Sequence, residues 1–253
     1  MVNLSNDQAD PQLLFGRRIL VTGAGDGIGK EAALIYARHG AHLFLLGRTR
    51  NKLETLAQQI QQETGMTPNI LVFDLASSDP AAYQQLAQTP SLLLAPLDGL
   101  LLNAGILGSL GPIAELDPQE WQQVLQINVT SALLLIQALL PPLRLSSSAR
   151  ILFTSSGVGR RGRAHWGAYA VSKFATEGLM QVLAAELADT SIRVNAINPG
   201  ATRTRMRAQA CPDEDPTQRP TPAELMPLYL DLMGPAGDAI HGQSLDAQAV
   251  AKR

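Results

Sequence analysis

Short runs of apolar residues alternate along this chain with longer stretches in which apolar residues recur every three or four positions. Each run is apolar throughout, as in a strand buried on both faces of a parallel sheet. The expected strands lie in residues 17–22, 41–47, 69–74, 97–103, 149–155 and 191–200, and the expected helices begin at Ile28, Arg50, Pro80, Pro118 and near Ala164. This pattern predicts an α/β fold, a Rossmann-like, doubly wound parallel sheet with helices on both faces.

The chain is expected to form one domain over residues 1–253. Its length and its 45% of apolar residues are enough for a full core. Residues 1–14 are expected to be an N-terminal extension. The polar, Pro-rich segment at about 208–222 is expected to be a substrate loop or lid, because too little chain follows it to form a second domain.

Charge and cysteine content exclude several classes of protein. A net charge of -2 with a pI near 6.1 argues against nucleic acid or an anionic membrane as the main partner. The apolar runs 91–107 and 132–143 are interrupted by polar residues or end at prolines, so neither is expected to span a bilayer. Cys211 is the only cysteine and the N-terminus does not read as a secretory signal, so a cytoplasmic location is expected.

A glycine-rich turn follows the first expected strand and leads directly into a helix. Glycines allow a tight turn and a close approach of the backbone to a pyrophosphate, which the free amides at the helix N-terminus stabilise. The expected ligand is therefore a dinucleotide. The candidate residues of this turn are Gly23, Gly25, Asp26, Gly27, Ile28 and Gly29.

The end of the second strand indicates which dinucleotide. A carboxylate that would bond the adenosine ribose is expected about twenty positions after the turn, but this chain has Arg48 there. A guanidinium can clamp a 2'-phosphate, so NADP is favoured and NAD is the less favoured cofactor. Asp26, an acidic residue within the turn, counts against NADP. The alternative interpretation of Arg48 is that it is an ordinary surface residue that does not contact the cofactor.

A tyrosine, a lysine and a serine form the candidate catalytic group. Tyr169 and Lys173 are four residues apart and share one face of the expected helix, and Ser156 precedes Tyr169 by thirteen residues. The unperturbed pKa of tyrosine is about 10, so a neighbouring ammonium is expected to lower it and make an acid/base. His165, between them, has no partners that mark a metal site or a triad.

From about Phe15 to Asp246 the chain resembles the short-chain dehydrogenase/reductase family, through the TGxxxGxG turn and the Ser-Tyr-Lys spacing. The resemblance implies hydride transfer between NADP(H) and a carbonyl or secondary alcohol, with Tyr169 as general acid/base, Ser156 on the substrate oxygen and Lys173 on the nicotinamide ribose. It also implies Asn128 as a fourth catalytic residue. The further cofactor contacts it implies are Asp74, Leu75, Asn103, Ala104, Gly105, Pro199, Gly200, Thr202 and Thr204.

The substrate and the assembly are less closely defined. Two arginine clusters, 160–163 and 203–207, are expected to flank the active-site mouth and to attract an anionic small molecule; solvated surface arginines or subunit contacts are the alternative. The resemblance implies a homodimer or homotetramer. A dinucleotide-binding sensor without turnover and an epimerase or dehydratase remain alternative functions.

Overall fold

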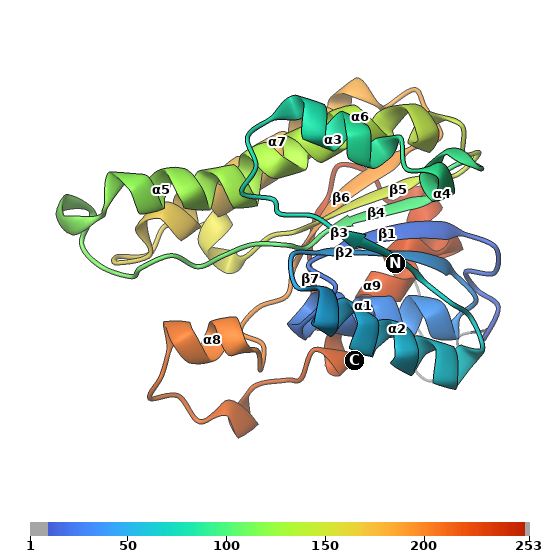
Figure 1. The fold of residues 1–253 in the computed structure, drawn as a ribbon. Coiled ribbons are helices and arrows are strands. Elements are labelled where there is room, and N and C mark those ends of the chain that lie inside the picture. The colour runs from blue at the N-terminus through green and yellow to red at the C-terminus, as the bar shows by residue number, and fades with distance from the viewer. Residues whose placement is uncertain (1–9, 251–253) are drawn as a thin grey trace.

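The structure is a computed structural model that describes residues 10–250, and it is built on a single parallel sheet (Figure 1). The strand order is β3-β2-β1-β4-β5-β6-β7, and every neighbouring pair is parallel. The strands are β1 Arg18–Thr22, β2 His42–Gly47, β3 Asn69–Val72, β4 Gly99–Leu102, β5 Arg150–Thr154, β6 Arg193–Asn198 and β7 Ser244–Asp246. The predicted fold class is confirmed.

Helices cover both faces of this sheet (Figure 1). One face carries α3, α5, α6 and α7, and the other carries α1, α2 and α9. The helices are α1 Gly27–Arg38, α2 Arg50–Thr64, α3 Pro80–Ala87, α4 Pro90–Leu93, α5 Pro118–Leu125, α6 Ser131–Arg144, α7 Gly167–Glu186, α8 Arg205–Ala210, α9 Met226–Met233 and α10 Ala247–Val250. The helix expected near Ala164 begins at Gly167.

Each face of the sheet has its own apolar core. In β1, Leu20 packs in the core under α3, α6 and α7, whereas Ile19 and Val21 pack in the core under α1, α2 and α9. All three side chains are fully buried. The uninterrupted apolar runs in the sequence follow from this double burial.

The long helix expected from Pro118 contains a π-helical turn, Gln126–Thr130, between α5 and α6. Together these segments run from Pro118 to Arg144, through both prolines near the end. The helix is thus longer than the apolar run 132–143, and by length and composition alone it could cross a membrane. However, 56% of its apolar window is buried inside the protein, as in the core helix of a globular fold.

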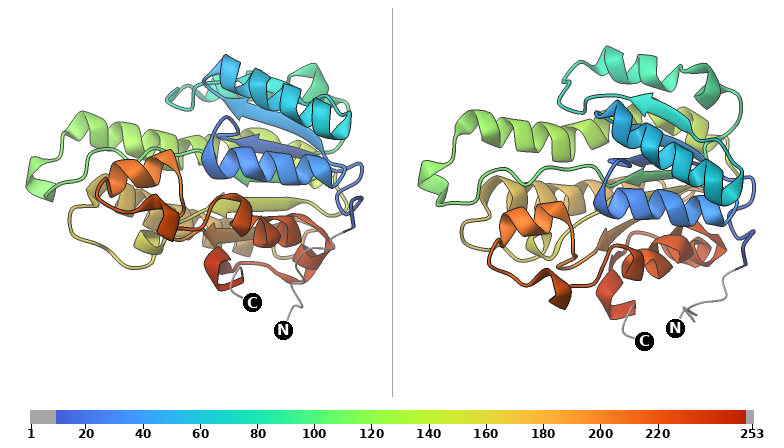
Figure 2. Two further views of the ribbon diagram at one scale, coloured as in Figure 1. Left: turned by 90° about the horizontal axis from the view of Figure 1, so that it is seen from below. Right: turned by 60° about the horizontal axis from the view of Figure 1, so that its bottom comes forward.

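The expected N-terminal extension and the expected substrate loop or lid have different places in the fold. Residues 1–9 of the expected extension 1–14 lie outside the described residues, but Leu14 is fully buried against the core of α1 and α9. The segment 208–222 is followed by α9 and by β7, which pairs with β6 in the same sheet. In both views of Figure 2, α8 and the segment after it lie at the same end of the molecule as the loops before α5 and α7.

Candidate active site

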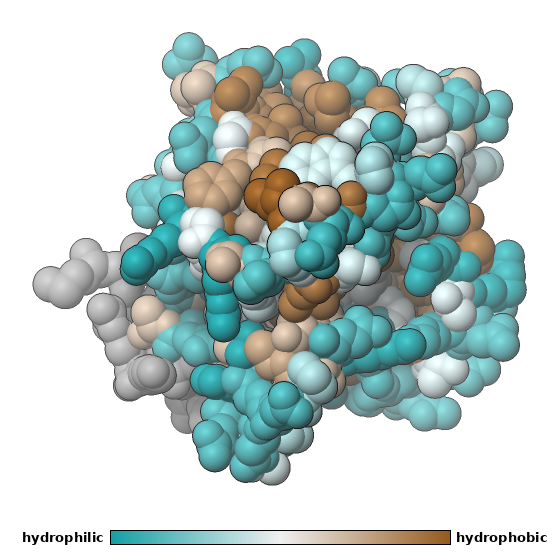
Figure 3. Space-filling view, turned by 90° about the vertical axis from the view of Figure 1, so that its left-hand side faces the viewer, coloured by the Kyte–Doolittle hydropathy of each residue, from teal (hydrophilic) through white to brown (hydrophobic). Residues whose placement is uncertain are grey.

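The predicted site residues follow the carboxyl ends of six neighbouring strands. Because the strands are parallel, these ends share one edge of the sheet, where α/β folds bind ligands. Figure 3 views the molecule from this end and shows apolar side chains near the middle of the face, with hydrophilic side chains around them. The sequence motifs therefore meet at one end of the molecule.

The glycine turn is packed so tightly that side chains would not fit. Gly23 and Gly27 have positive φ angles of 65° and 54°. A Cβ on Gly29 would lie 2.4 Å from the Gly23 carbonyl oxygen, and one on Gly23 would lie 3.0 Å from the Ala104 Cα. The lack of side chains thus leaves the backbone at the N-terminus of α1 open to the close approach of a pyrophosphate, so these residues fit a dinucleotide.

Asp26 does not present a free negative charge at this turn. Its carboxylate accepts a hydrogen bond from the Gly27 amide and pairs with the Lys52 ammonium at 2.6 Å. The hydrogen bond from Lys52 is the main cause that holds the Asp26 pKa below its ordinary value. The residue that counted against NADP is therefore neutralised by a lysine from α2.

Arg48 lies exposed just beyond β2, at the edge where the adenosine ribose of a dinucleotide would bind. Among residues 10–250, its side chain makes no hydrogen bond or ion pair, whereas nearby Arg50 lies 3.6 Å from Glu54. Ile28, the remaining side chain of the glycine turn, packs against the core of α1 and α9. The Arg48 guanidinium is free to bind a phosphate.

Thr22 is a site residue that sequence reasoning missed. Its hydroxyl accepts hydrogen bonds from the Asn103 and Ala104 amides at 2.9 and 3.0 Å. It donates in turn to the Leu101 carbonyl at 3.2 Å. A hydroxyl at the last position of β1, directly before the turn, was the available signal. Thr22 thus links the start of the glycine turn to the residues that follow β4.

The other expected adenosine contacts lie on neighbouring loops. Asp74 accepts a hydrogen bond from the Ala76 amide at 3.0 Å, which leaves the rest of its exposed carboxylate available. Leu75 is buried in the core, and Gly105 lies against Asn128, whose Oδ1 would be 3.2 Å from a Cβ at that position.

Tyr169 and Lys173 lie on one face of α7, as the spacing predicts. The Lys173 ammonium is 5.5 Å from the centre of the Tyr169 ring, and it donates a 2.7 Å hydrogen bond to the Thr154 carbonyl at the end of β5. Tyr169 is 8% exposed and Lys173 is 5% exposed. The structure therefore brings the acid/base pair together in a nearly closed site.

The direction of the Tyr169 pKa shift differs from the expectation. Burial raises the pKa of the phenol to about 12, and the nearby Ser156 hydroxyl acts in the opposite direction. Burial also lowers the pKa of Lys173 to about 8, which the Glu177 carboxylate partly offsets. The expected lowering of the Tyr169 pKa was therefore wrong for the protein alone, because desolvation of the phenolate is the largest influence on this pKa.

The two adjacent serines have different environments. Ser155 is 1% exposed, and its hydroxyl donates to the Glu177 carboxylate. Ser156 is partly exposed, and its hydroxyl lies close enough to Tyr169 to affect the phenol. This difference supports the choice of Ser156, which the sequence made on spacing alone.

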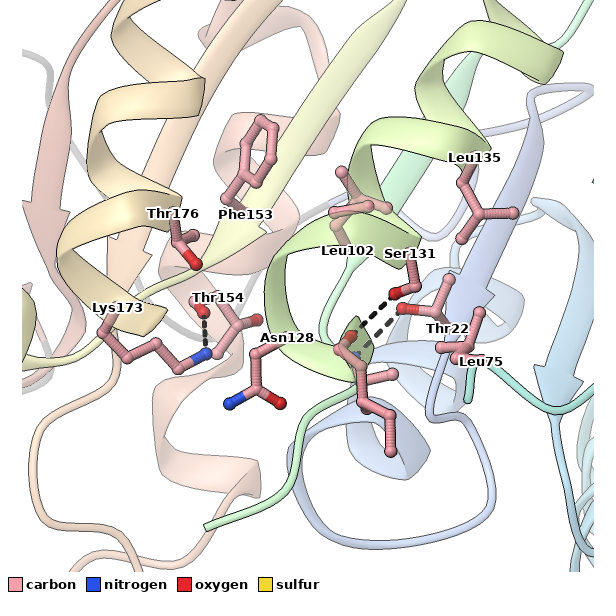
Figure 4. Close-up of a pocket in the computed structure, with 13 residues that line it drawn as sticks. Thr22, Leu75, Leu102, Asn128, Ser131, Leu135, Phe153, Thr154, Lys173 and Thr176 are labelled. Atoms are coloured by element: carbon pink, nitrogen blue, oxygen red, sulfur yellow. Dashed lines mark hydrogen bonds between the residues drawn. The ribbon is translucent and has the colours of Figure 1, made fainter. Parts of the chain in front are cut away.

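Asn128 lies in the π-helical turn and is fixed by its neighbours. Its amide donates to the Ile106 carbonyl and the Ser172 hydroxyl, both at 2.9 Å, and its Oδ1 accepts from the Ile106 amide at 2.8 Å. Figure 4 shows Asn128 and Lys173 at one small cavity, with Thr22 and Ser131 also in its wall. Its volume of about 10 Å³ is room for one water molecule.

The segment after β6 lies over the glycine turn. Thr202 is 4% exposed and donates to the Pro199 carbonyl at 3.2 Å, and Gly200 has a positive φ of 69°. Thr204 caps α8 by accepting from the Arg207 amide, and its Cγ2 would be 3.5 Å from a Cβ on Gly27. The expected contacts 199–204 thus adjoin the cofactor turn.

Half of the arginines expected to attract substrate are engaged elsewhere. Arg160 pairs with Asp246 at 2.8 Å, and Arg203 donates to the Pro216 and Thr217 carbonyls. Arg207 pairs with Glu214 at 2.6 Å. These three guanidinium groups are thus held by contacts within the protein. In the part of the chain that the structure describes, the side chains without such a bond are Arg161, Arg163 and Arg205.

The described residues contain no group of three or more His, Cys, Asp or Glu side chains that could hold a metal ion. His165 is exposed and adopts a left-handed backbone conformation with φ of 69°. Its carbonyl accepts from the Gly111 amide at 2.9 Å. The contribution of His165 is therefore to hold the loop before α7.

Comparison with known proteins gives close relatives. The family model described as short chain dehydrogenase matches residues 17–215. The uncharacterised oxidoreductase YciK of Escherichia coli is 54% identical over 241 residues, which are 95% of each chain. A short chain dehydrogenase from Shigella flexneri 2a, solved in complex with NADP, is 54% identical with a TM-score of 0.92, over 94% of this chain and all of that one.

A more distant relative has a named substrate. The trans-4-hydroxycyclohexanecarboxylate dehydrogenase of Sinomonas cyclohexanicum is 30% identical over 192 residues, which are 75% of this chain and 73% of that protein.

Proposed function

The chain belongs to the short-chain dehydrogenase/reductase family, and we propose that it interconverts a carbonyl compound and a secondary alcohol with NADP(H). The observation that carries this proposal is the meeting of Ser156, Tyr169 and Lys173 at the sheet edge that holds the glycine turn. The family membership and the NADP bound to the Shigella relative support the cofactor. Arg48, free at the end of β2, is the residue of this chain that would hold the 2'-phosphate.

The protein alone keeps Tyr169 in the form that reduction needs. A phenol with a pKa of about 12 is protonated at neutral pH, so it can donate its proton to an oxygen that becomes negative. The partly exposed Ser156 hydroxyl would hydrogen-bond the same oxygen and so stabilise its charge. When bound, the reduced nicotinamide supplies the hydride that adds to the carbonyl carbon.

Lys173 and Asn128 would restore the proton to Tyr169. The Lys173 ammonium has one partner, the Thr154 carbonyl, so two of its donors remain for a ribose hydroxyl and a water. The cavity beside Asn128 has room for such a water. After Tyr169 has given its proton to the substrate, Lys173 would release one of its own protons towards the phenolate and take a replacement from solvent through this water, so that both groups regain their starting form.

The name of one relative supports an acidic substrate. The Sinomonas relative, by its name, acts on a cyclic secondary alcohol that carries a carboxylate. Of the arginines whose side chains make no hydrogen bond or ion pair in the described residues, Arg163 and Arg205 would attract a substrate of this charge. The substrate proposed here is accordingly a small anionic carbonyl compound or alcohol.

A homodimer or homotetramer is proposed through α6 and α7. Val171, Phe174 and Val182 of α7 are 41%, 45% and 58% exposed, and Leu133 of α6 is 39% exposed. Positions 171, 174 and 182 recur on one face of α7, so they form an apolar surface that a second copy would cover. A cytoplasmic location is proposed as well, in keeping with the single cysteine.

A panel of ketones and aldehydes, with NADPH consumption recorded for the wild type and for Tyr169→Phe, tests the proposal. We expect turnover of some carbonyls by the wild type and a loss of about a hundredfold or more in the variant. NADPH binding without turnover of any carbonyl or alcohol would favour a cofactor-binding sensor. Full activity in the variant would exclude Tyr169 as the acid.

A further inference from the structure

Arg163 is held over an aromatic ring that adjoins Tyr169. Its guanidinium carbon lies 5.2 Å from the centre of the Trp166 ring, and that ring lies 6.0 Å from the Tyr169 ring. Trp166 therefore adjoins both the proposed proton donor, Tyr169, and the Arg163 cation. Such stacking orients a guanidinium and leaves its N–H groups at the edge available.

The backbone holds Arg163 and Trp166 in place. The Trp166 amide donates to the Arg163 carbonyl at 3.2 Å and closes a tight turn. The loop is also joined to Gly111. The Gly111 amide donates a hydrogen bond to the His165 carbonyl, and Gly111 forms an isolated β-bridge with Trp166. Arg163 is therefore positioned by its loop and is more restricted than an ordinary surface arginine.

No acidic side chain neutralises this cation within the described residues 10–250. Arg160, three residues earlier, is occupied by Asp246 and Ser244 of β7. Arg161 is exposed, and only its backbone amide is bonded, to the Gly157 carbonyl. Among the arginines of this loop, only Arg163 combines a guanidinium without an ion pair or hydrogen bond in the described residues with a place against Trp166, which adjoins Tyr169.

We propose that Arg163, stacked on Trp166, binds the carboxylate of a substrate whose carbonyl oxygen lies at Tyr169. The carboxylate and the carbonyl would be at opposite ends of a compact body, such as a six-membered ring, that lies along Trp166. A carboxylate fits this single guanidinium because it accepts two parallel N–H bonds and carries one negative charge. The inference rests on the proposed function, since it assigns the substrate end to Tyr169.

Calorimetry with a carboxylate that cannot react tests the binding site without turnover. Cyclohexanecarboxylate and the neutral cyclohexanecarboxamide would be titrated into the protein saturated with NADP. We expect the wild type to bind the carboxylate at least about tenfold more tightly, and Arg163→Gln to lose this preference. Arg161→Gln, which removes the same charge from the same loop, should change the affinity by less than about threefold.

Turnover provides the second measurement. The ratio of kcat/KM for 4-oxocyclohexanecarboxylate to that for its methyl ester should fall about tenfold or more in Arg163→Gln and stay near the wild-type value in Arg161→Gln. Equal affinities for acid and amide, no binding of the acid by the wild type, or equal losses in both variants would overturn the inference. If the wild type bound the carboxylate selectively but reduced neither ketone, the role of Arg163 in binding would stand, and the proposed reaction on these compounds would be contradicted.

Discussion

The Lys173 ammonium is bonded to the carbonyl of Thr154, two residues before Ser156. One hydrogen bond of 2.7 Å therefore joins the helix that carries Tyr169 to the strand that leads into Ser156. The contact also fixes Lys173 in a nearly closed site, where burial lowers its pKa to about 8.

A pH dependence of activity follows from this burial. Because the folded-state pKa of Lys173 is lowered, its positive charge is present at neutral pH and is lost as the pH rises through about 8. We expect kcat/KM for NADPH-dependent reduction to fall above that pH. A profile measured between about pH 6 and 10 checks this. Lys173→Met should be poorly active and lack this limb, whereas an unchanged wild-type rate up to pH 10 would contradict the account.

Replacement of Arg48 should change cofactor preference. Arg48→Ala removes the guanidinium placed to bind the 2'-phosphate, so the ratio of kcat/KM for NADPH to that for NADH should fall about tenfold or more. Arg50→Ala is the matched control, since Arg50 lies two residues on and lies near Glu54. A ratio that responds equally to both substitutions would indicate only a general effect of charge.

A methyl group at Gly29 should destroy the dinucleotide turn. The added Cβ would lie 2.4 Å from the Gly23 carbonyl oxygen, so the backbone must move away from the α1 N-terminus. We expect Gly29→Ala to weaken NADPH binding about a hundredfold or more, as measured by calorimetry. Gly178→Ala places the same methyl group on α7, where no atom beyond the neighbouring backbone of the helix lies within 4 Å, and this variant should bind NADPH normally. Normal binding by Gly29→Ala would contradict the proposed cofactor site.

Glu214 should hold the segment after α8 in place. It pairs with Arg207 and Arg219, and these hydrogen bonds hold its pKa at about 2. The lowered pKa means that the pairing persists at neutral pH and is lost only as the pH falls towards that value. We expect Glu214→Gln to speed tryptic cleavage of this segment several-fold, whereas Asp213→Asn, at a side chain that makes no hydrogen bond in the described chain, should not. Equal cleavage rates would mean that the pairs do not order the segment.

The sequence predicted the features that depend on neighbouring residues. The apolar runs located β1 to β6 but not the short strand β7, and the glycines located the turn beside α1, because burial and backbone freedom are read from local pattern. The place of Lys173 on the face of Tyr169 followed from helix periodicity alone.

The features that were not predicted from the sequence depend on contacts between distant parts of the chain. Asp26 meets Lys52 only when α2 packs beside the turn, and Arg160 meets Asp246 only when β7 joins the sheet. The pKa of Tyr169 depends on how completely the fold buries it, and no spacing in the sequence gives that burial. Arg163 is a similar case. Its partner Trp166 is near in sequence, but the sequence does not show that Arg163 lacks an acidic partner among the described residues, because this depends on how the loop folds.

The most direct measurement is the fate of hydrogen from C4 of the nicotinamide. A carbonyl compound that the wild type reduces would be incubated with NADPH deuterated on the transferred face of C4, and the alcohol examined by mass spectrometry and NMR. The account predicts one deuterium on the carbinol carbon and none on oxygen after exchange, at a rate that falls in Tyr169→Phe. An alcohol without deuterium, with either face of C4 labelled, would contradict hydride transfer as the reaction of this site.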